Sequence, residues 1–506
     1  MAASAHRSPS AVAVSTASLG TPAVAVSGAP SASPEALDGS RPGGPTEVQE
    51  LAAYVHSATF EQIGDEALEQ LRIRILDTLG VAIAALDAEP IRAVRELLED
   101  LGGAPRATLI GGGRTSPDRA AFYNSALSRY LDFMDSYLAA GETNHPSDNL
   151  GAVLAAAESV DASGQELLTA LAVAYQIHTR LSDVAPVRAK GFDHTTQGAY
   201  AAAAAAAKAM RLPAEQIAHA IAIAGTANNA LRVTRTGSLS HWKGLAYPQV
   251  AKEGTFAALL AGRGITGPEE VFEGNKGFKD SIAGDFTIDW SSEGLDAVRR
   301  TIIKKHNAEI HSQSALDAAQ DIRAQDGFAI EAVRSIRLRT FDVAHSIIGG
   351  GEEGDKRTVR TKEEADHSLP WMLAVVLLDG ELTPAQYHHE RIVADDVQDL
   401  MRAVEIVSDD AFSARFPDLM PADLEVTLAD GTVFRSAQDS YEGFHTDPLS
   451  WEGARAKFDL LTTPFATEEL REEIAGIVRD LEHHCVRELT GALARASTSR
   501  ATPAER

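Results

Sequence analysis

The chain has 506 residues, enough for two or three domains at about 150 residues each. Lys and Arg number 46 and Asp and Glu number 72, which gives a formal charge of −26 at pH 7. Because phosphate recognition draws on clustered cations, this balance argues against a nucleic-acid-binding protein. The single cysteine, Cys485, excludes an intrachain disulfide and any metal site or iron–sulfur cluster that needs several thiolates.

No stretch of the sequence is long and apolar enough to predict a membrane-spanning helix, so we expect no membrane among the partners of this protein. The runs of lowest polarity, 369–378 and 199–207, are far shorter than the roughly 20 residues that a spanning helix needs. Residues 1–45 are rich in Ala, Ser, Pro and Val and lack a basic start or a leucine-type apolar block, which predicts a disordered tail. The absence of acids before Glu35 leaves a transit peptide as the alternative, but Arg7 is the only arginine there, so we predict a cytoplasmic protein.

The first half of the chain is predicted to be almost wholly helical. Thr46 and Gln49 have the spacing of a capping box, so a helix is expected to start there. Apolar residues at helical spacing follow in three segments: 68–79, 94–101 and 122–131. Alanine dominates 152–157 and 199–207, and its small side chain lets helices approach closely. We therefore expect these two segments in the centre of a helical assembly.

After about residue 300 the pattern changes to that of a small α+β unit. Residues 335–339 alternate as a half-exposed strand does. The segments 424–428 and 432–435 flank Asp430-Gly431, a dipeptide favoured in two-residue hairpin loops, and 392–406 is predicted to be a helix. Helical periodicity returns after residue 450, and these C-terminal helices are expected to rejoin the first domain. The glycine clusters 111–113 and 349–351 lack the features of a phosphate loop and predict turns.

The densest polar cluster lies in residues 130–149. Asp132, Asp135 and Ser136 are spaced at i, i+3 and i+4, which would place them on one helix face. The following segment would return His145 toward that face. These residues could form part of a functional site, but acids near a helix end are often merely solvated. Spacing alone leaves both interpretations open.

Three further clusters concentrate cations, hydroxyls and histidines. The first is 190–196, directly before the alanine-rich helix. Thr195 or Thr196 could cap that helix, whose N-terminal amides would favour an anion beside His194. The other two are 232–244, with Arg235 and Lys243, and 304–313, with Lys304 and His311. Each alone is typical of a solvated turn. Together, inside so acidic a chain, they indicate a cleft with focused positive charge that binds a small polycarboxylate, near a domain junction.

With these residues in place, the chain resembles the MmgE/PrpD family over roughly 46–495. The resemblance is carried, in the family's order, by six segments: Leu131-Asp132-Phe133 through His145-Pro146-Ser147-Asp148-Asn149, Gly191-Phe192-Asp193-His194-Thr195-Thr196, Trp242-Lys243, Asn307-Ala308-Glu309 with His311-Ser312-Gln313, Ala365-Asp366-His367-Ser368-Leu369-Pro370, and Asp447-Pro448-Leu449-Ser450-Trp451-Glu452. Six matches in order are far more specific than any one of them.

The resemblance implies a mainly α fold, in which a large all-helical domain carries an inserted, smaller α+β lid domain. Applied to this chain, it predicts helical-domain parts at 46–300 and 445–495, a lid at 301–444, and tails at 1–45 and 496–506. It also implies a homodimer whose core reaction needs no metal or cofactor.

The family's pocket residues, carried over by motif, define the candidate site. They fall on six positions: Asp132, Ser136, His145, His194, Lys243 and Lys304. Arg235 and His311 are further candidates for substrate binding. Two departures concern the decarboxylase-like relatives: Glu309 stands where they have a pocket histidine, and Trp371 replaces a tyrosine. Because the lost phenol is a possible proton donor, the family's dehydratase activity is favoured over its decarboxylase activity.

The expected reaction is dehydration of 2-methylcitrate to 2-methylaconitate. It needs a base for a C–H proton beside a carboxylate and an acid for the departing hydroxyl, and histidine suits both tasks. We expect His145 and His194 to divide these roles in either order, with Asp132 orienting one imidazole and Lys243 and Lys304 holding carboxylates. The alternatives are decarboxylation of cis-aconitate, epimerisation or isomerisation of a related dicarboxylate, and a weakly catalytic carboxylate-binding relative.

Overall fold

The computed structural model describes residues 44–237 and 239–497. The predicted tails, 1–45 and 496–506, lie outside this described part except at their inner ends. Pro45 onward forms one unit by its contacts. No helix in the described ranges is both long and apolar enough to cross a membrane.

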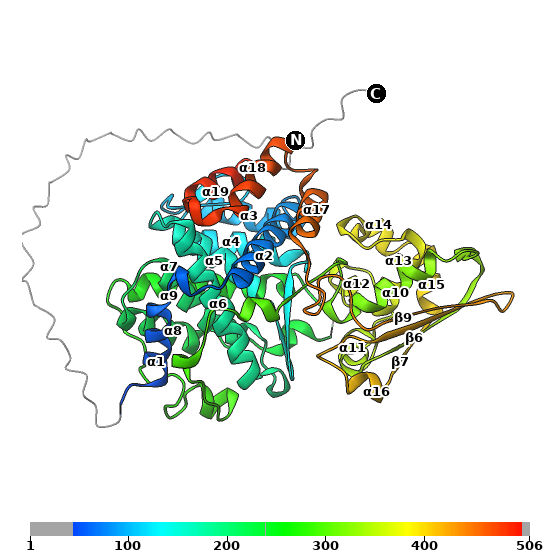
Figure 1. Ribbon diagram of the computed structural model, residues 1–506, viewed down its shortest axis with the longest axis horizontal. Helices are drawn as coiled ribbons and strands as arrows, with labels where there is room; N and C mark the ends of the chain where they lie inside the picture. Colours follow the sequence, from blue (N-terminus) through cyan, green and yellow to red (C-terminus); the bar gives the residue numbers. More distant parts are fainter. Residues whose placement is uncertain (1–43, 238, 498–506) are drawn as a thin grey trace, which may run out of the picture. The chain divides into compact units, whose positions relative to one another are not determined.

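Helices dominate the first half of the described chain, as predicted (Figure 1). In chain order they are α1 (Glu47–Ser57), α2 (Asp65–Ala84), α3 (Glu89–Leu101), α4 (Pro117–Tyr130), α5 (Leu150–Ser159), α6 (Gly164–Val184), α7 (Thr195–Ala209), α8 (Ala214–Ala227) and α9 (Trp242–Ala261). The start of α1 is confirmed, because the Thr46 amide donates to Gln49 Oε1 over 3.0 Å. The alanine-rich helices α5 and α7 are almost completely buried, which confirms their expected central place.

Close helix packing around α7 depends on small residues. A Cβ atom at Gly254 of α9 would lie 2.9 Å from the backbone nitrogen of Ala203, so the two backbones approach too closely for a larger residue. On the other side of the core, Phe458 covers Gly80 of α2, where an added Cβ would lie 3.2 Å from its ring. Phe458 belongs to α17 (Trp451–Thr462), which with α18 (Glu468–Arg479) and α19 (Val486–Leu493) packs into the same core as the N-terminal helices.

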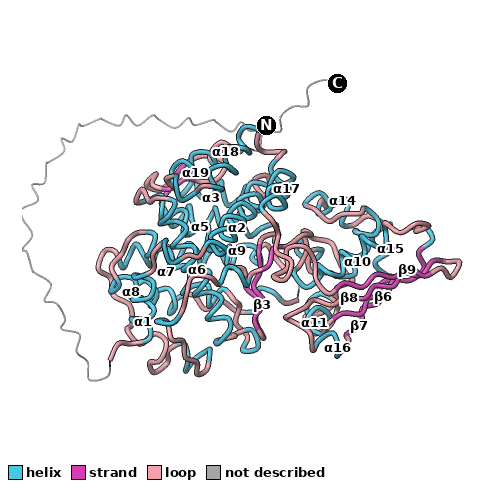
Figure 2. Tube along the Cα trace, in the orientation of Figure 1, coloured by secondary structure: helices cyan, strands magenta, loops and turns pink. Residues whose placement is uncertain are grey.

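A second hydrophobic core lies under a four-stranded sheet with the order β7-β6-β8-β9 (Figure 2). Its strands are β6 (Val333–Thr340), β7 (Val404–Ser408), β8 (Ala422–Leu428) and β9 (Val433–Gln438). The helices of this region are α10 (Gln313–Arg323), α11 (Asp342–Ile348), α12 (Lys362–Ala365), α13 (Leu369–Asp379), α14 (His389–Ile392), α15 (Asp395–Arg402) and α16 (Asp410–Ser413). Strict alternation of burial along β8 shows that one face of the sheet is packed. The predicted strand at 335–339 and the hairpin around Asp430-Gly431 are confirmed.

The predicted helix 392–406 is wrong at its C-terminal end. The helix α15 ends at Arg402, and Val404–Ser408 forms β7, which pairs in parallel with β6. The β-branched residues Val404, Ile406 and Val407 favour a strand, and the available sheet edge decides the conformation.

The predicted helix face of Asp132, Asp135 and Ser136 is also wrong. Helix α4 ends at Tyr130, Asp132 adopts a left-handed conformation with φ of 55°, and Asp135–Ala139 forms the strand β3. This strand pairs on one side with β4 (Glu142–Asn144) and on the other with β5 (Ile302–Ile303). The sharp turn at Asp132 and the hairpin after β3 place the polar residues of this segment beside residues from the second half. A separate two-stranded pair, β1 (Ala107–Thr108) and β2 (Arg114–Thr115), lies apart from the site.

Candidate active site

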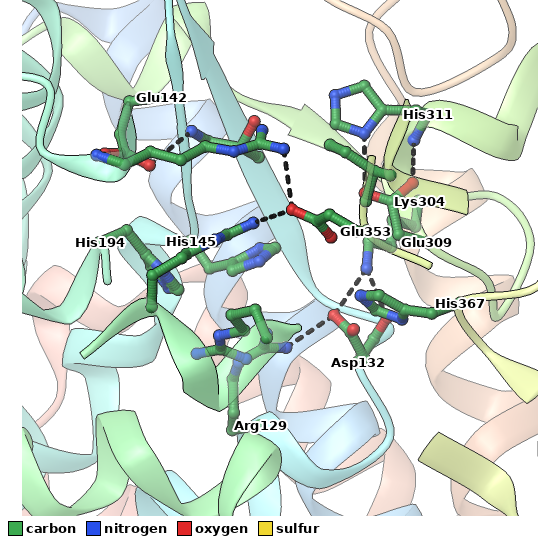
Figure 3. A pocket seen from close by; sticks show the side chains of 15 residues that line it. Arg129, Asp132, Glu142, His145, His194, Lys304, Glu309, His311, Glu353 and His367 are labelled. Atoms are coloured by element: carbon green, nitrogen blue, oxygen red, sulfur yellow. Dashed lines mark hydrogen bonds and ion pairs between the residues drawn. The ribbon is translucent and has the colours of Figure 1, made fainter. Parts of the chain in front are cut away.

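A cavity of about 50 Å³ collects polar side chains from both halves of the described chain (Figure 3). It is lined by Arg129, Asp132, Glu142, Thr143, His145, Arg188, His194, Arg232, Arg235, Lys304, Glu309, His311, Ile347, Glu353 and His367. Six of the eight predicted site residues are in this set: Asp132, His145, His194, Arg235, Lys304 and His311. The cavity therefore gathers imidazoles, guanidinium groups and an ammonium group, as expected of a polycarboxylate site.

His145 and His194 lie side by side, with ring centroids 5.4 Å apart. His145 follows β4 directly, and its Nδ1 lies 2.8 Å from the carbonyl oxygen of Asp135. Since a carbonyl only accepts, Nδ1 carries the proton and Nε2 is left as the basic nitrogen of the neutral ring. Ser136 Oγ lies 3.1 Å from the same Nδ1. Ser136 does not line the cavity, and it contacts the site through His145.

His194 stands at the start of α7, and its Nδ1 lies 3.3 Å from Asp193 Oδ1. Its Nε2 is buried and has no hydrogen-bond partner among the described residues. The predicted cap by Thr195 or Thr196 is wrong: both hydroxyls lack a partner in the described chain, and Asp193 Oδ1 accepts from the Thr195 amide over 3.2 Å. Two buried imidazoles thus face each other, each with one nitrogen fixed by an acceptor of its own.

Burial lowers the pKa of His145 well below its ordinary value, and the positive charges of Arg129 and Lys304 lower it further. Burial likewise holds the pKa of His194 well below its ordinary value, although Asp193 opposes this. Both rings are consequently neutral near pH 7, which suits a base.

Asp132 is the centre of a buried charge cluster. Its Oδ1 accepts from Arg129 over 2.6 Å and from Lys304 over 2.7 Å, and its Oδ2 accepts from Lys243 over 3.2 Å. Burial alone would raise the pKa of Asp132, but the charges of Arg129, Lys304 and Lys243 hold it well below its ordinary value. We expected the Asp132 carboxylate to contact an imidazole. In the structure its hydrogen-bond partners are instead three cations, Arg129, Lys304 and Lys243.

Lys243 and Arg235 lie around this cluster. Lys243 also donates to Asp366 Oδ1 over 2.7 Å, and it stands outside the set of cavity-lining residues. It therefore contacts the site through Asp132. Arg235 donates to Asp193 Oδ2 over 2.9 Å and to the Lys243 carbonyl over 2.9 Å, which links the segment before His194 to the start of α9.

The two departures from the family pattern lie in different environments. Glu309 lines the cavity and pairs with His311, whose Nδ1 lies 2.7 Å from Glu309 Oε1. Burial would raise the pKa of Glu309, but His311, His367 and Lys304 lower it to about 2, so it stays ionised. Trp371 is completely buried in the second core and does not line the cavity. Its indole ring packs on Tyr387 with centroids 5.2 Å apart.

Six polar residues that line the cavity were not among the candidate site residues predicted from the sequence: Arg129, Glu142, Arg188, Arg232, Glu353 and His367. Arg129 lies inside a segment predicted as an ordinary helix, and Arg188 is an isolated arginine, so neither carries a local signal. Arg232 and His367 lay within the motifs noted above. Glu353 follows the glycine cluster 349–351, for which the sequence predicts only a turn.

One group of acids and a histidine has the spacing of a cation site. Ligand atoms of Asp132, Asp366 and His367 lie within 4.8 Å of one another. The ammonium group of Lys243 contacts both carboxylates, so a lysine already supplies positive charge at this point. The absence of a metal or cofactor from the reaction stays a prediction.

Comparisons with known proteins agree with the geometry. Residues 49–291 match the MmgE/PrpD N-terminal domain and residues 306–483 match the MmgE/PrpD C-terminal domain. The chain is 28% identical to the mitochondrial 2-methylcitrate dehydratase of Yarrowia lipolytica, with 80% of this chain and 81% of that protein covered. It is 29% identical to the 2-methylcitrate dehydratase of Cupriavidus necator (81% and 86%) and 25% identical to the cis-aconitate decarboxylase of Mus musculus (86% and 90%).

Proposed function

Since the chain belongs to the MmgE/PrpD family, we propose that it is a metal-independent lyase that dehydrates 2-methylcitrate to 2-methylaconitate. The observation that supports this most directly is the pair of neutral imidazoles, His145 and His194, buried 5.4 Å apart in a cavity rich in cations. Water elimination beside a carboxylate needs a base and an acid at such a distance, and needs positive charge around both.

The two histidines divide the proton transfers. The unpartnered Nε2 of His194, and Nε2 of His145 opposite a fixed Nδ1, are the nitrogens that meet the substrate. A bound polycarboxylate brings several negative charges next to both rings, which raises their pKa and allows one of them to hold the proton that the leaving hydroxyl needs. The other ring takes the C–H proton.

The cations hold the carboxylates and the charge that develops on them. Lys304, Arg129 and Arg235 line the cavity, so their positive charge faces the substrate. Lys243 acts from behind Asp132 and supports the position of Lys304 through that carboxylate. Pre-arranged donors of this kind stabilise the aci-carboxylate that forms when the proton leaves.

We also propose that residues 301–444 form a lid over a helical domain built from 46–300 and 445–495. Two separate hydrophobic cores support this division, as does a cavity lined from both sides of it.

A homodimer is supported by three exposed apolar side chains near the site, Leu231, Val233 and Trp242, which are 48–70% exposed. Light scattering on the purified chain tests the dimer. A cytoplasmic location, proposed from composition, is tested by fractionation, since one relative is named as mitochondrial.

The test of the activity is incubation with 2-methylcitrate, citrate, cis-aconitate and tartrate, followed by mass spectrometry. We expect loss of water from 2-methylcitrate. Loss of carbon dioxide from cis-aconitate would favour the second candidate, which the similarity to the mouse decarboxylase supports. Deuterium uptake without an alkene would indicate an epimerase or isomerase, and tight binding without turnover a carboxylate-binding relative.

Variants of the two histidines assign the roles. We expect His145→Ala and His194→Ala each to lower kcat by at least about 100-fold, in line with the loss of a general acid or base. The exposed His483 provides the matched control, His483→Ala, which should leave turnover unchanged. Near-normal turnover in either site variant would remove that histidine from the mechanism.

A further inference from the structure

The acid Glu353 occupies the cavity in an unusual way. It lies in the segment between α11 and α12, yet its side chain is buried, and Figure 3 shows it pointing into the middle of the cavity. Its Oε1 accepts from Arg188 Nη2 over 3.0 Å and from Arg232 Nη2 over 2.8 Å. Its Oε2 is buried without a hydrogen-bond partner among the described residues. A carboxylate between two guanidinium groups is also how a substrate carboxylate would be bound.

The other three acids of the cavity are held by different partners. Asp132 is bonded to Arg129 and Lys304, and Glu309 to His311. Glu142 accepts from the amides of Val187 and Arg188. Glu353 alone among these four is held only by arginine side chains. Its removal therefore leaves Arg188 without an acid and Arg232 with Asp193 alone, 3.8 Å away, and breaks neither the Asp132 nor the Glu309 cluster.

The two arginines are anchored independently of Glu353. Arg188 and Arg232 begin the short 3-10 turns Arg188–Lys190 and Arg232–Arg235, and the Arg232 amide donates to the Gly191 carbonyl over 2.9 Å. Glu353, in contrast, is carried by a glycine-rich turn, in which Gly350 and Gly354 both have a φ of 97°. The backbone at Gly350 and Gly354 can therefore adopt conformations that other residues avoid.

The small volume of the cavity also favours a displacement. At about 50 Å³ it holds a few water molecules, whereas a tricarboxylate has many more heavy atoms. Withdrawal of one buried glutamate side chain would enlarge the cavity and free two cations in the same step.

We infer that Arg188 and Arg232 form a carboxylate-binding subsite of the substrate pocket, and that Glu353 fills this subsite until one carboxylate of the substrate displaces it. This inference rests on the proposed function, since it assumes a polycarboxylate ligand. The internal glutamate lowers the apparent affinity of any ligand that uses the two arginines, because such a ligand binds only while Glu353 is out of the subsite. A dicarboxylate has too few carboxylates to contact both arginines and the region of Lys304. It therefore gains less binding free energy from displacing Glu353 than a tricarboxylate does, which makes the site selective for tricarboxylates.

The test measures binding of a tricarboxylate without a hydroxyl group, tricarballylate, by isothermal titration calorimetry on the full chain. Removal of the internal competitor in Glu353→Gln should tighten tricarballylate binding roughly tenfold. The neighbouring Glu352 is exposed, so Glu352→Gln removes the same charge and should leave the affinity unchanged. Arg188→Gln and Arg232→Gln should each weaken binding roughly tenfold or more. Glutarate, a dicarboxylate, should gain less than tricarballylate from Glu353→Gln.

Unchanged or weaker tricarballylate binding in both Glu353→Gln and Glu353→Ala, with thermal unfolding like that of the unaltered chain, would overturn the inference. So would the absence of measurable binding in all variants. Since tricarballylate cannot lose water, the result does not depend on turnover. Tighter tricarballylate binding in Glu353→Gln, together with no reaction of 2-methylcitrate, would refute the proposed activity and support the subsite. Turnover of 2-methylcitrate without a gain in tricarballylate affinity would support the activity and refute the subsite.

Discussion

The buried carboxyl of Asp148 should make the stability of the protein fall as the pH rises. Asp148 is completely buried, and neither of its carboxylate oxygens has a hydrogen-bond partner within the described ranges. The nearest cation is Arg129, whose Nε lies 3.7 Å away. Burial raises the pKa of Asp148 from 3.8 to about 7, although Arg129 and Arg235 partly oppose this. The folded protein therefore holds a proton here that the unfolded chain has released.

The sign and size follow from that difference. Between pH 3.8 and about 7 the folded state binds one proton more than the unfolded state at this group, so the free energy of unfolding decreases as pH rises. The full difference corresponds to about 4 kcal/mol, at 1.36 kcal/mol for each pH unit. Asp148→Asn keeps the size of the side chain and removes the titration. The variant should therefore match the unaltered chain near pH 4 and become more stable than it, by up to about 4 kcal/mol, at pH 8.

The assay is urea unfolding followed by tryptophan fluorescence at several pH values from 4 to 8. The exposed Asp100 supplies the control, because Asp100→Asn removes the same charge from the surface of α3 and should give a curve parallel to that of the unaltered chain. If the difference between Asp148→Asn and the unaltered chain stays constant over this range, the carboxyl is already ionised in the folded protein near pH 4 and the reasoning is wrong.

Three further predictions concern packing and ion pairing outside the cavity. Gly164→Ala would place a Cβ 1.7 Å from the Leu481 carbonyl oxygen and should lower stability by about 1–3 kcal/mol in urea unfolding, whereas Gly476→Ala, with open space around it, should raise it by up to about 1 kcal/mol. Lys457→Met leaves Asp77 buried without its 2.7 Å partner and should cost about 3–5 kcal/mol, part of which Lys457→Met with Asp77→Asn recovers; no recovery would refute the pairing. Trp371→Tyr should lower stability by about 1–3 kcal/mol without raising turnover, because Trp371 lies outside the cavity lining; a gain in turnover would contradict this.

The sequence predicted the helices and the hairpin because their signals are local. The capping pair Thr46 and Gln49 fixes the start of α1 by itself, and Asp430-Gly431 fixes a turn whatever lies around it. The strand β7 was misread as helix because its conformation depends on the edge of β6, from which it is separated by more than sixty residues. The conformation of Asp132 likewise depends on distant groups, since Lys304 donates to both its carbonyl and its carboxylate.

The same distinction separates the site residues that were predicted from those that were missed. His145 and His194 stand in compact motifs, and six such motifs in order identified them before any geometry was known. Arg129 and Arg188 have no such neighbours, and only the folded structure brings their guanidinium groups to the cavity.

The buried cations of the cavity are accompanied by several acids, because an unpaired buried charge is costly. Asp132 supplies the counter-charge for Lys304, and Glu353 supplies it for Arg232. A substrate with several carboxylates can replace only those acids that are able to withdraw. Asp132 is held from three directions by cations, whereas Glu353 stands on a glycine-rich turn. Stability of the empty site and affinity for the substrate thus oppose each other at Glu353, and not at Asp132.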